Sequence, residues 1–232
     1  MGALHRIGLI SLIGLTGLIG PLSSFAQTAP VVAPPALIVT WQADAYAPAG
    51  YPGKILPPRD GTVHLFVQAI DSNNKLISLK NAEIAWSANS KFISGGVGAV
   101  TADFVLNQFT TKTYAVQVLI KDYENVGDLK KSVLITRAVP IAVVEVPYAD
   151  GALSASNASL VATPYFFNAL ALNDFLFDWK VQGSVITNTL AGLTLDLRLA
   201  KPGDHITAEV TVTNRLNNLE AATTKAIVSI KK

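Results

Sequence analysis

The sequence predicts an all-β protein: two tandem antiparallel β-sandwiches that follow an N-terminal signal helix. Trp86 and Trp179 lie 93 positions apart, and at the same offset residues 100–106 match residues 193–199. Self-similarity at a fixed period marks a repeated structural unit. Short alternating segments with turn residues between them are typical of sandwiches. The sequence therefore predicts two copies of one β-module in tandem.

The first 26 residues have the three-part pattern of a secretory signal peptide. A weakly positive start precedes an apolar run at 7–22, and small residues precede Gln27. The run is short for a membrane span, which needs about 20 apolar residues. We expect cleavage and an exported protein, whether extracellular, periplasmic or on the cell surface. The alternative is an uncleaved anchor formed by 7–22. Residues 27–35 form a proline-rich spacer.

The first module is expected at residues 36–139, where apolar and polar residues alternate. Turns are expected at 71–74 and at the glycine cluster 95–98, and a hairpin loop at 122–128 contains Gly127, which suits positive φ. The expected strands are 37–43, 62–69, 84–88, 100–106, 114–120 and 133–137.

The second module is expected at residues 140–232 and repeats the same order. A loop is expected at 214–220, and Pro164 indicates a sheet edge or a bulge. No glycine or serine linker joins the modules, and Pro140 limits bending at the junction, so we expect a semi-rigid, elongated rod. The expected strands are 141–146, 160–167, 175–181, 193–199, 206–213 and 226–231.

Two features resemble the bacterial immunoglobulin-like (Ig-like) and PKD-like domains of secreted and surface proteins. One is a tryptophan on the third strand of each module, and the other is the penultimate strand AEVTVTN at 208–214. PKD domains usually follow the tryptophan with an Asp-Phe-Gly-Asp turn, which is missing here. The resemblance over residues 36–232 is therefore to Ig-like sandwiches in general and to no specific family. It implies spacers, adhesive modules or assembly contacts.

Composition excludes several classes of partner. The chain has 18 Lys and Arg against 16 Asp and Glu, which gives a formal net charge of +2. That balance gives no excess of positive charge with which to bind nucleic acid or an anionic membrane. The chain has no Cys, so each module must be held by its apolar core and not by a disulfide.

The largest difference between the modules is a proline-rich loop at 46–61, which has only a shorter counterpart in the second module. Its tyrosines offer contact area at low entropy cost, which suits a binding loop. The alternative is that the prolines protect a sheet edge, which is their commoner use. The candidate partner or glycan contacts are Tyr46, Tyr51, Lys54 and Arg59.

A second unshared stretch is the aromatic segment 165–175. One strand face cannot bury all of its apolar side chains, because alternation sends every second one outward. They form either an exposed partner surface or a cover over the open end of their own sandwich. The candidate residues are Tyr165, Phe167, Leu170 and Leu172.

Catalytic, cofactor and metal sites are not expected. The histidines left after signal removal, His64 and His205, have no acid or nucleophile that the sequence pairs with them. Asp103 and Asp196 recur at outward strand positions, where a charge is ordinary. The acidic residues of loop 122–128 fail the calcium-loop spacing. No GxSxG, HExxH or phosphate-binding loop occurs.

These observations predict an exported, non-enzymatic structural or adhesive protein that contacts envelope or surface proteins. The alternative is an extracellular glycan-binding module, with Tyr46, Tyr51 and the aromatic segment near Phe166 as stacking surfaces. A hydrolase is the third and weakest alternative. No nucleic-acid partner or cofactor is expected, and membrane contact is expected only through an uncleaved N-terminal segment.

Overall fold

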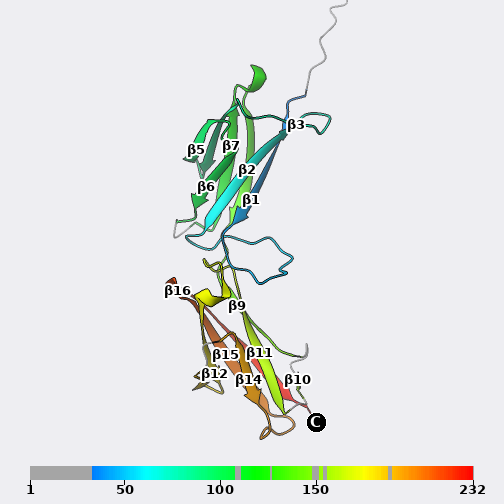
Figure 1. Ribbon diagram of the computed structural model, residues 1–232, viewed down its shortest axis with the longest axis vertical. Coiled ribbons are helices and arrows are strands. Elements are labelled where there is room, and N and C mark those ends of the chain that lie inside the picture. The colour runs from blue at the N-terminus through cyan, green and yellow to red at the C-terminus, as the bar shows by residue number, and fades with distance from the viewer. Residues whose placement is uncertain are drawn as a thin grey trace, which may run out of the picture. The chain divides into compact units, whose positions relative to one another are not determined.

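The computed structural model describes residues 33–107, 111–125, 127–147, 152–153, 156–187 and 190–231. The predicted signal segment 1–26 and most of the spacer lie outside these residues. The described chain forms two antiparallel β-sandwiches (Figure 1), with two short 3-10 turns, η1 (Tyr123–Asn125) and η2 (Leu172–Asp174). Among the described residues, no helix has the length and apolar character that crossing a membrane requires.

The first sandwich consists of two four-stranded sheets. In one sheet, β2 pairs with β1 on one side and with β3 and β6 on the other; in the second, the order is β5-β4-β7-β8. All of these pairs are antiparallel. The strands are β1 (Ala36–Ala43), β2 (Thr62–Ile70), β3 (Leu76–Ile77), β4 (Glu83–Ala88), β5 (Lys91–Val97), β6 (Thr101–Val105), β7 (Thr113–Lys121) and β8 (Leu129–Thr136).

The second sandwich repeats this layout. Its sheets have the orders β14-β11-β9 and β10-β16-β15-β12-β13, and the pair β10–β16 is parallel. The strands are β9 (Ile141–Glu145), β10 (Ala152–Leu153), β11 (Asn157–Tyr165), β12 (Phe175–Val181), β13 (Ser184–Val185), β14 (Gly192–Asp196), β15 (His205–Asn214) and β16 (Asn217–Ile230).

The two tryptophans occupy equivalent places in the two cores. Trp86 on β4 and Trp179 on β12 are fully buried. The indole N–H of Trp86 donates to the carbonyl of Ala99 at 2.9 Å, and that of Trp179 donates to the carbonyl of Leu190 at 3.0 Å. Each ring thus fills the core while its one polar atom is satisfied at the segment leading into β6 or β14. The predicted fold class, two tandem Ig-like sandwiches, is confirmed.

The turn predicted at the glycine cluster 95–98 is wrong for its first three residues, because β5 ends at Val97. Strand β5 continues through Gly95 and Gly96, which pair with Ala85 and Ile84 of β4. A Cβ on Gly95 would lie 2.7 Å from the Ile84 carbonyl oxygen, so the glycine permits close approach of the two strands. The turn itself is at Gly98, where φ is +69°.

The predicted loop at 214–220 is also wrong. Only Arg215 and Leu216 lie between β15 and β16, so the hairpin is tight and β16 is the longest strand. The polar run misled the prediction, because two of its side chains are buried and bonded to each other. Asn214 Nδ2 donates to Glu220 Oε2 at 2.6 Å, and Asn214 Oδ1 accepts from the Leu216 amide at 2.9 Å.

Pro164 lies at an edge, as predicted. Strand β14 pairs with β11 only as far as Val161, so at Pro164 the sole paired neighbour is β9. The two-residue strands β3, β10 and β13 were not predicted, because two residues are too few to show alternation.

Candidate functional site at the junction of the sandwiches

The two stretches that the repeat does not share lie against each other. Tyr46, in the proline-rich loop, forms an isolated antiparallel bridge with Phe167. The Tyr46 amide donates to the Phe167 carbonyl at 2.9 Å, and the Phe166 amide donates to the Tyr46 carbonyl at 2.7 Å. The loop of the first sandwich therefore adds a short backbone ladder to the second.

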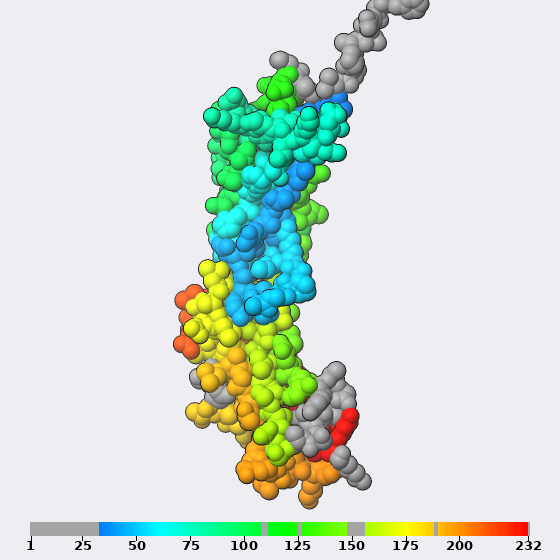
Figure 2. Space-filling view, turned by 45° about the vertical axis from the view of Figure 1, so that its right-hand side comes forward, coloured from blue at the N-terminus to red at the C-terminus, as the bar shows by residue number. Residues whose placement is uncertain are grey.

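Aromatic rings extend this contact. The Tyr46 ring meets the Phe175 ring edge to face, with centroids 5.0 Å apart. The Tyr51 ring meets those of Tyr165 and Phe166, each with centroids 5.7 Å apart. In Figure 2 the loop surface, in blue, lies against the yellow segment that contains these rings. Edge-to-face pairs of this kind contribute about 0.5–1.5 kcal/mol each beyond the area they bury.

Hydrogen bonds complete the junction. The Asn168 side chain donates to the Asp60 carbonyl at 3.3 Å, and the Ala138 amide donates to the Pro57 carbonyl at 2.8 Å. The Asn168 amide in turn donates to the Glu220 carboxylate, at 2.9 and 3.1 Å. Loop, connection and second sandwich are thus linked through backbone groups, which tolerate few alternative positions.

Neither sequence interpretation of the proline-rich loop included this role. Tyr46 and Tyr51 contact the second sandwich instead of standing free. The Lys54 ammonium lies 3.6 Å from the centre of the Trp41 ring, and partial burial lowers the pKa of Lys54. Arg59 Nε donates to the Asp60 carboxylate at 3.1 Å. Three of the four candidates therefore have aromatic partners, and the fourth has a carboxylate partner.

The expectation that Phe167 belongs to an exposed patch is wrong. Phe167 is fully buried in the second core, where its ring meets Phe175 at 5.1 Å. It covers the end of its own sandwich, as the alternative interpretation held. Tyr165 is half-buried against Tyr51, whereas Leu170 and Leu172 are 75% and 44% exposed. The four candidates therefore do not form one surface.

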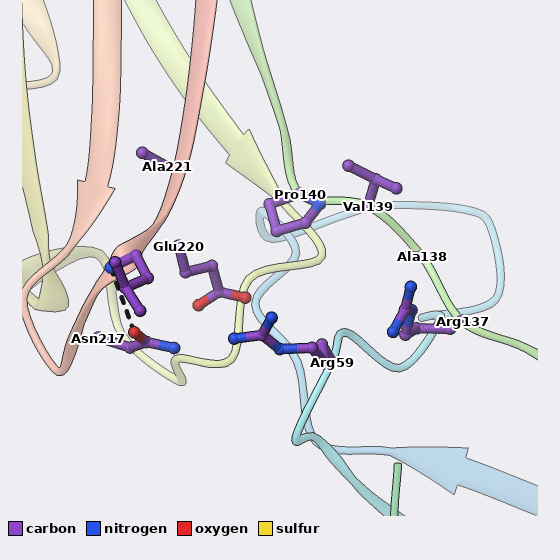
Figure 3. A pocket seen from close by; sticks show the side chains of 9 residues that line it. Arg59, Arg137, Ala138, Val139, Pro140, Asn217, Glu220 and Ala221 are labelled. Carbon is purple, nitrogen blue, oxygen red and sulfur yellow. Dashed lines mark hydrogen bonds between the residues drawn. The ribbon is translucent and has the colours of Figure 1, made fainter. Parts of the chain in front are cut away.

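A small hollow of about 240 Å³ lies beside the joint, between the loop, the connecting segment and β16. In Figure 3 the Arg59 guanidinium and the Glu220 carboxylate point toward one another across it. Both side chains have partners around the joint: Asp60 for Arg59, and Asn214 and Asn168 for Glu220. We therefore interpret the hollow as part of the contact between the two sandwiches and not as a ligand site. Its lining residues are Arg59, Arg137, Ala138, Val139, Pro140, Asn217, Leu219, Glu220 and Ala221.

A cluster that sequence reasoning missed surrounds His64. Its Nδ1 lies 2.8 Å from Asp103 Oδ1, and its Nε2 lies 3.0 Å from Asp44 Oδ2. Hydrogen bonds to Asp103 and then to Asp44 raise the pKa of His64, because both stabilise the imidazolium. The strand register brings these residues together, because His64 on β2 lies opposite Asp103 on β6. Strand pairing is not visible in one strand's sequence.

The geometry of the His64 cluster suits a structural ion pair better than a catalytic site. Both imidazole nitrogens are occupied by carboxylates, so neither is left to accept a proton from a substrate. Across the described part of the chain, no group of three His, Cys, Asp or Glu side chains could hold a metal ion. The imidazolium instead ties β2 to β6 and to Asp44, the residue at which the proline-rich loop begins to leave β1.

The outward face of β9 and β11 carries aliphatic side chains among its polar ones. Three of its aliphatic side chains are about two-fifths exposed: Ile141 45%, Val143 41% and Val161 41%. In the strand register Ile141 lies opposite Tyr165 and Val143 opposite Thr163, while Val161 lies opposite Glu145, whose carboxylate accepts from the Thr163 hydroxyl at 2.8 Å. Val161, Val143 and Ile141 therefore form an apolar row that runs diagonally across the two strands to Tyr165, with Glu145 beside it.

No family model and no curated protein matches the sequence. A comparison with solved structures finds neighbours of low similarity. The three N-terminal domains of the highly immunogenic outer capsid protein of bacteriophage RB49 are 13% identical over 84% of this chain, with a TM-score of 0.43. The chain spans 59% of that phage chain.

Two further neighbours are more distant. The fibronectin(III)-like modules of Clostridium thermocellum CbhA are 13% identical over 84% of this chain and 94% of theirs, with a TM-score of 0.29. The beta-glucuronidase of Parabacteroides merdae is 9% identical over 85% of this chain and 25% of its own, with a TM-score of 0.29. At these values the strand topology itself identifies the class: a tandem pair of Ig-like β-sandwiches.

Proposed function

We propose that the protein is an exported structural component that holds two docked sandwiches together and presents a sheet face to another envelope or surface protein. The observation that carries this proposal is the apolar row on β9 and β11. Exposed aliphatic side chains that cluster beside aromatic rings are a feature of protein contact surfaces.

Two other observations support the proposal. The apolar run at 7–22 with small residues before Gln27 has the pattern of an export signal. The joint commits two tyrosines and several backbone groups to contacts inside the chain, which suits a component that must keep its two modules together.

The test is capture of partners from envelope extracts by the full chain carrying Val143→Lys. A lysine at the centre of the row should reduce capture at least about tenfold, because a buried unpaired charge costs several kcal/mol. Ile227→Lys is the matched control, since Ile227 is an exposed aliphatic residue on β16, in the other sheet. Equal capture by both variants, or no envelope protein captured by the wild type, would reject the proposal.

The glycan alternative is not favoured by the geometry of its candidate residues. Stacking on a sugar needs an accessible ring face. Across the joint the Tyr46 ring contacts Phe175, and the Tyr51 ring contacts Tyr165 and Phe166. The His64 cluster does not support a hydrolase, because both imidazole nitrogens are hydrogen-bonded to carboxylates.

A further inference from the structure

The first sandwich carries an edge strand that its repeat lacks. Strand β5 has seven residues and pairs only with β4, whereas its counterpart β13 has two. Among the described strands, none pairs with the other side of β5. Proteins usually keep edge strands short or charged, because unpaired N–H and C=O groups recruit further strands. Here the edge is long, and Lys91 at its start is its single charge.

The outward side chains of β5 are large and apolar. Phe92 is 67% exposed and Val97 is 73% exposed. Both face away from the core, because they pair with Ser87 and Glu83, which alternate with the buried Ile84 and Trp86. The strand therefore offers hydrogen-bonding groups along its edge and apolar contact area on its outward face.

We propose that β5 pairs antiparallel with β5 of a second copy of this chain, around a two-fold axis near Gly96. In this register Val97 of one copy lies opposite Gly95 of the other. Gly95 has no side chain, and the Phe92 ring lies 3.3 Å from where its Cβ would be. Each Val97 would then pack beside the Phe92 ring of the second copy, so that the two exposed residues of each strand cover each other.

The same register suits the backbone and the charges. A Cβ on Gly96 would meet nothing within 4 Å, so the centre of the pair is sterically open. The two Lys91 side chains would lie at opposite ends of the paired strands, where their repulsion is screened. Strand β5 has a bulge opposite Trp86 and Ser87 and ends at Val97, so regular pairing is expected at residues 95–97 and not along the whole strand.

The contact is small, so the association should be weak. Stable interfaces bury about 1,200–2,000 Å² in total, and three paired residues on each strand bury much less. We therefore expect monomers at about 10 µM and a substantial dimer fraction at about 1 mM.

The experiment is sedimentation velocity of the full chain across that range, with Val97→Lys and Val185→Lys. Val185 lies on β13 and is also 73% exposed, which makes it a matched control. Val97→Lys should abolish the concentration dependence, and Val185→Lys should leave it unchanged. Association through residues 1–32 would be common to both variants and cancels in the comparison. Circular dichroism spectra matching the wild type would establish that both variants fold.

Cysteine variants give an independent reading, because the natural chain has no Cys. Val97→Cys should form a disulfide-linked dimer under mild oxidation at least about tenfold faster than Val185→Cys. A wild type that stays monomeric at about 1 mM, or equal behaviour of the Val97 and Val185 variants, would overturn the proposal. So would capture of a different protein through Val97 by a chain that does not self-associate.

Discussion

His64 shows how one side chain can connect three parts of the first sandwich. It lies on β2 and contacts Asp103 on β6 and Asp44 at the start of the proline-rich loop. The side chains are 46%, 66% and 44% exposed, so solvent screens the attraction and each pair contributes little. The contribution nevertheless depends on pH, because the imidazole must be protonated to attract both carboxylates.

We expect the stability that His64 provides to be fully present below pH 6.5 and to be lost as the pH rises through its raised folded-state pKa. The sign follows from the direction of the shift, since a raised pKa means that the folded state binds the proton more tightly. The effect should be about 0.5 kcal/mol or less.

Urea unfolding of wild type and His64→Gln at pH 5.5 and 8.5 measures this effect. The wild type should lose more stability between the two pH values than His64→Gln does. His205→Gln is the control, because His205 contacts only Ser229 among the side chains that are hydrogen-bonded to it here. A pH dependence that survives in His64→Gln and disappears in His205→Gln would refute the assignment.

Single residues were the scale at which sequence reasoning was least complete. Asp103 and Asp196 recur at the same offset, and both were expected to be ordinary surface charges. Asp103 in fact pairs with His64, whereas Asp196 accepts three hydrogen bonds from the Arg198 side chain, which lowers its pKa to about 2. The repeat predicts position but not partner, because the partner belongs to another strand or to a residue that the other copy lacks.

At the scale of elements, alternation located the long strands and failed where it was interrupted. The end of strand β5, residues 95–97, was predicted to be a turn because glycines usually end strands, yet Gly95 permits close approach of β4. The start of β16 was read as a loop because it is polar, yet Glu220 is buried and accepts bonds from Asn214 and Asn168. Both errors arise from tertiary contacts that override local preference.

The turn between β5 and β6 depends on Gly98. Its φ is +69°, and a Cβ there would lie 2.6 Å from the Lys80 carbonyl oxygen. We expect Gly98→Ala to destabilise the chain by about 1–3 kcal/mol, from the positive φ and the backbone clash together. Thermal or urea unfolding of the full chain measures the loss.

Gly192→Ala is the control for that substitution. Gly192 has an ordinary φ, and the nearest atom to its Cβ position is the Leu160 carbonyl oxygen at 4.0 Å. Its replacement should change stability by less than about 1 kcal/mol. If the two variants were equally stable, the turn would not have the strained geometry described.

At the scale of the whole molecule, comparing the two copies separated the shared core from the unshared contacts. The tryptophans and the inward strand residues are shared and fill the two cores. The two unshared stretches, 46–61 and 165–175, meet at the joint. The sequence could show that each stretch was unusual. It could not show that they contact each other, because more than 100 residues separate them and no periodic pattern links loops.

The joint adds contacts that the expectation of a semi-rigid rod, based on Pro140 and the missing glycine or serine linker, did not include. A proline restricts one φ angle, whereas the Tyr46 bridge and the Tyr51 ring contacts engage side chains and backbone from both sandwiches. Stiffness between the modules, if measured, should therefore depend on the tyrosines more than on the proline.

The most direct test of the joint is a nuclear Overhauser experiment on the full chain, with labelled tyrosine and phenylalanine rings. The account predicts cross-peaks from the Tyr51 ring to Tyr165 and Phe166, whose ring centroids lie 5.7 Å away. The Tyr51 cross-peaks should vanish in Tyr51→Ala, while those between Phe167 and Phe175 remain. Absence of the Tyr51 cross-peaks in the wild type, with the Phe167–Phe175 cross-peaks present, would contradict the account.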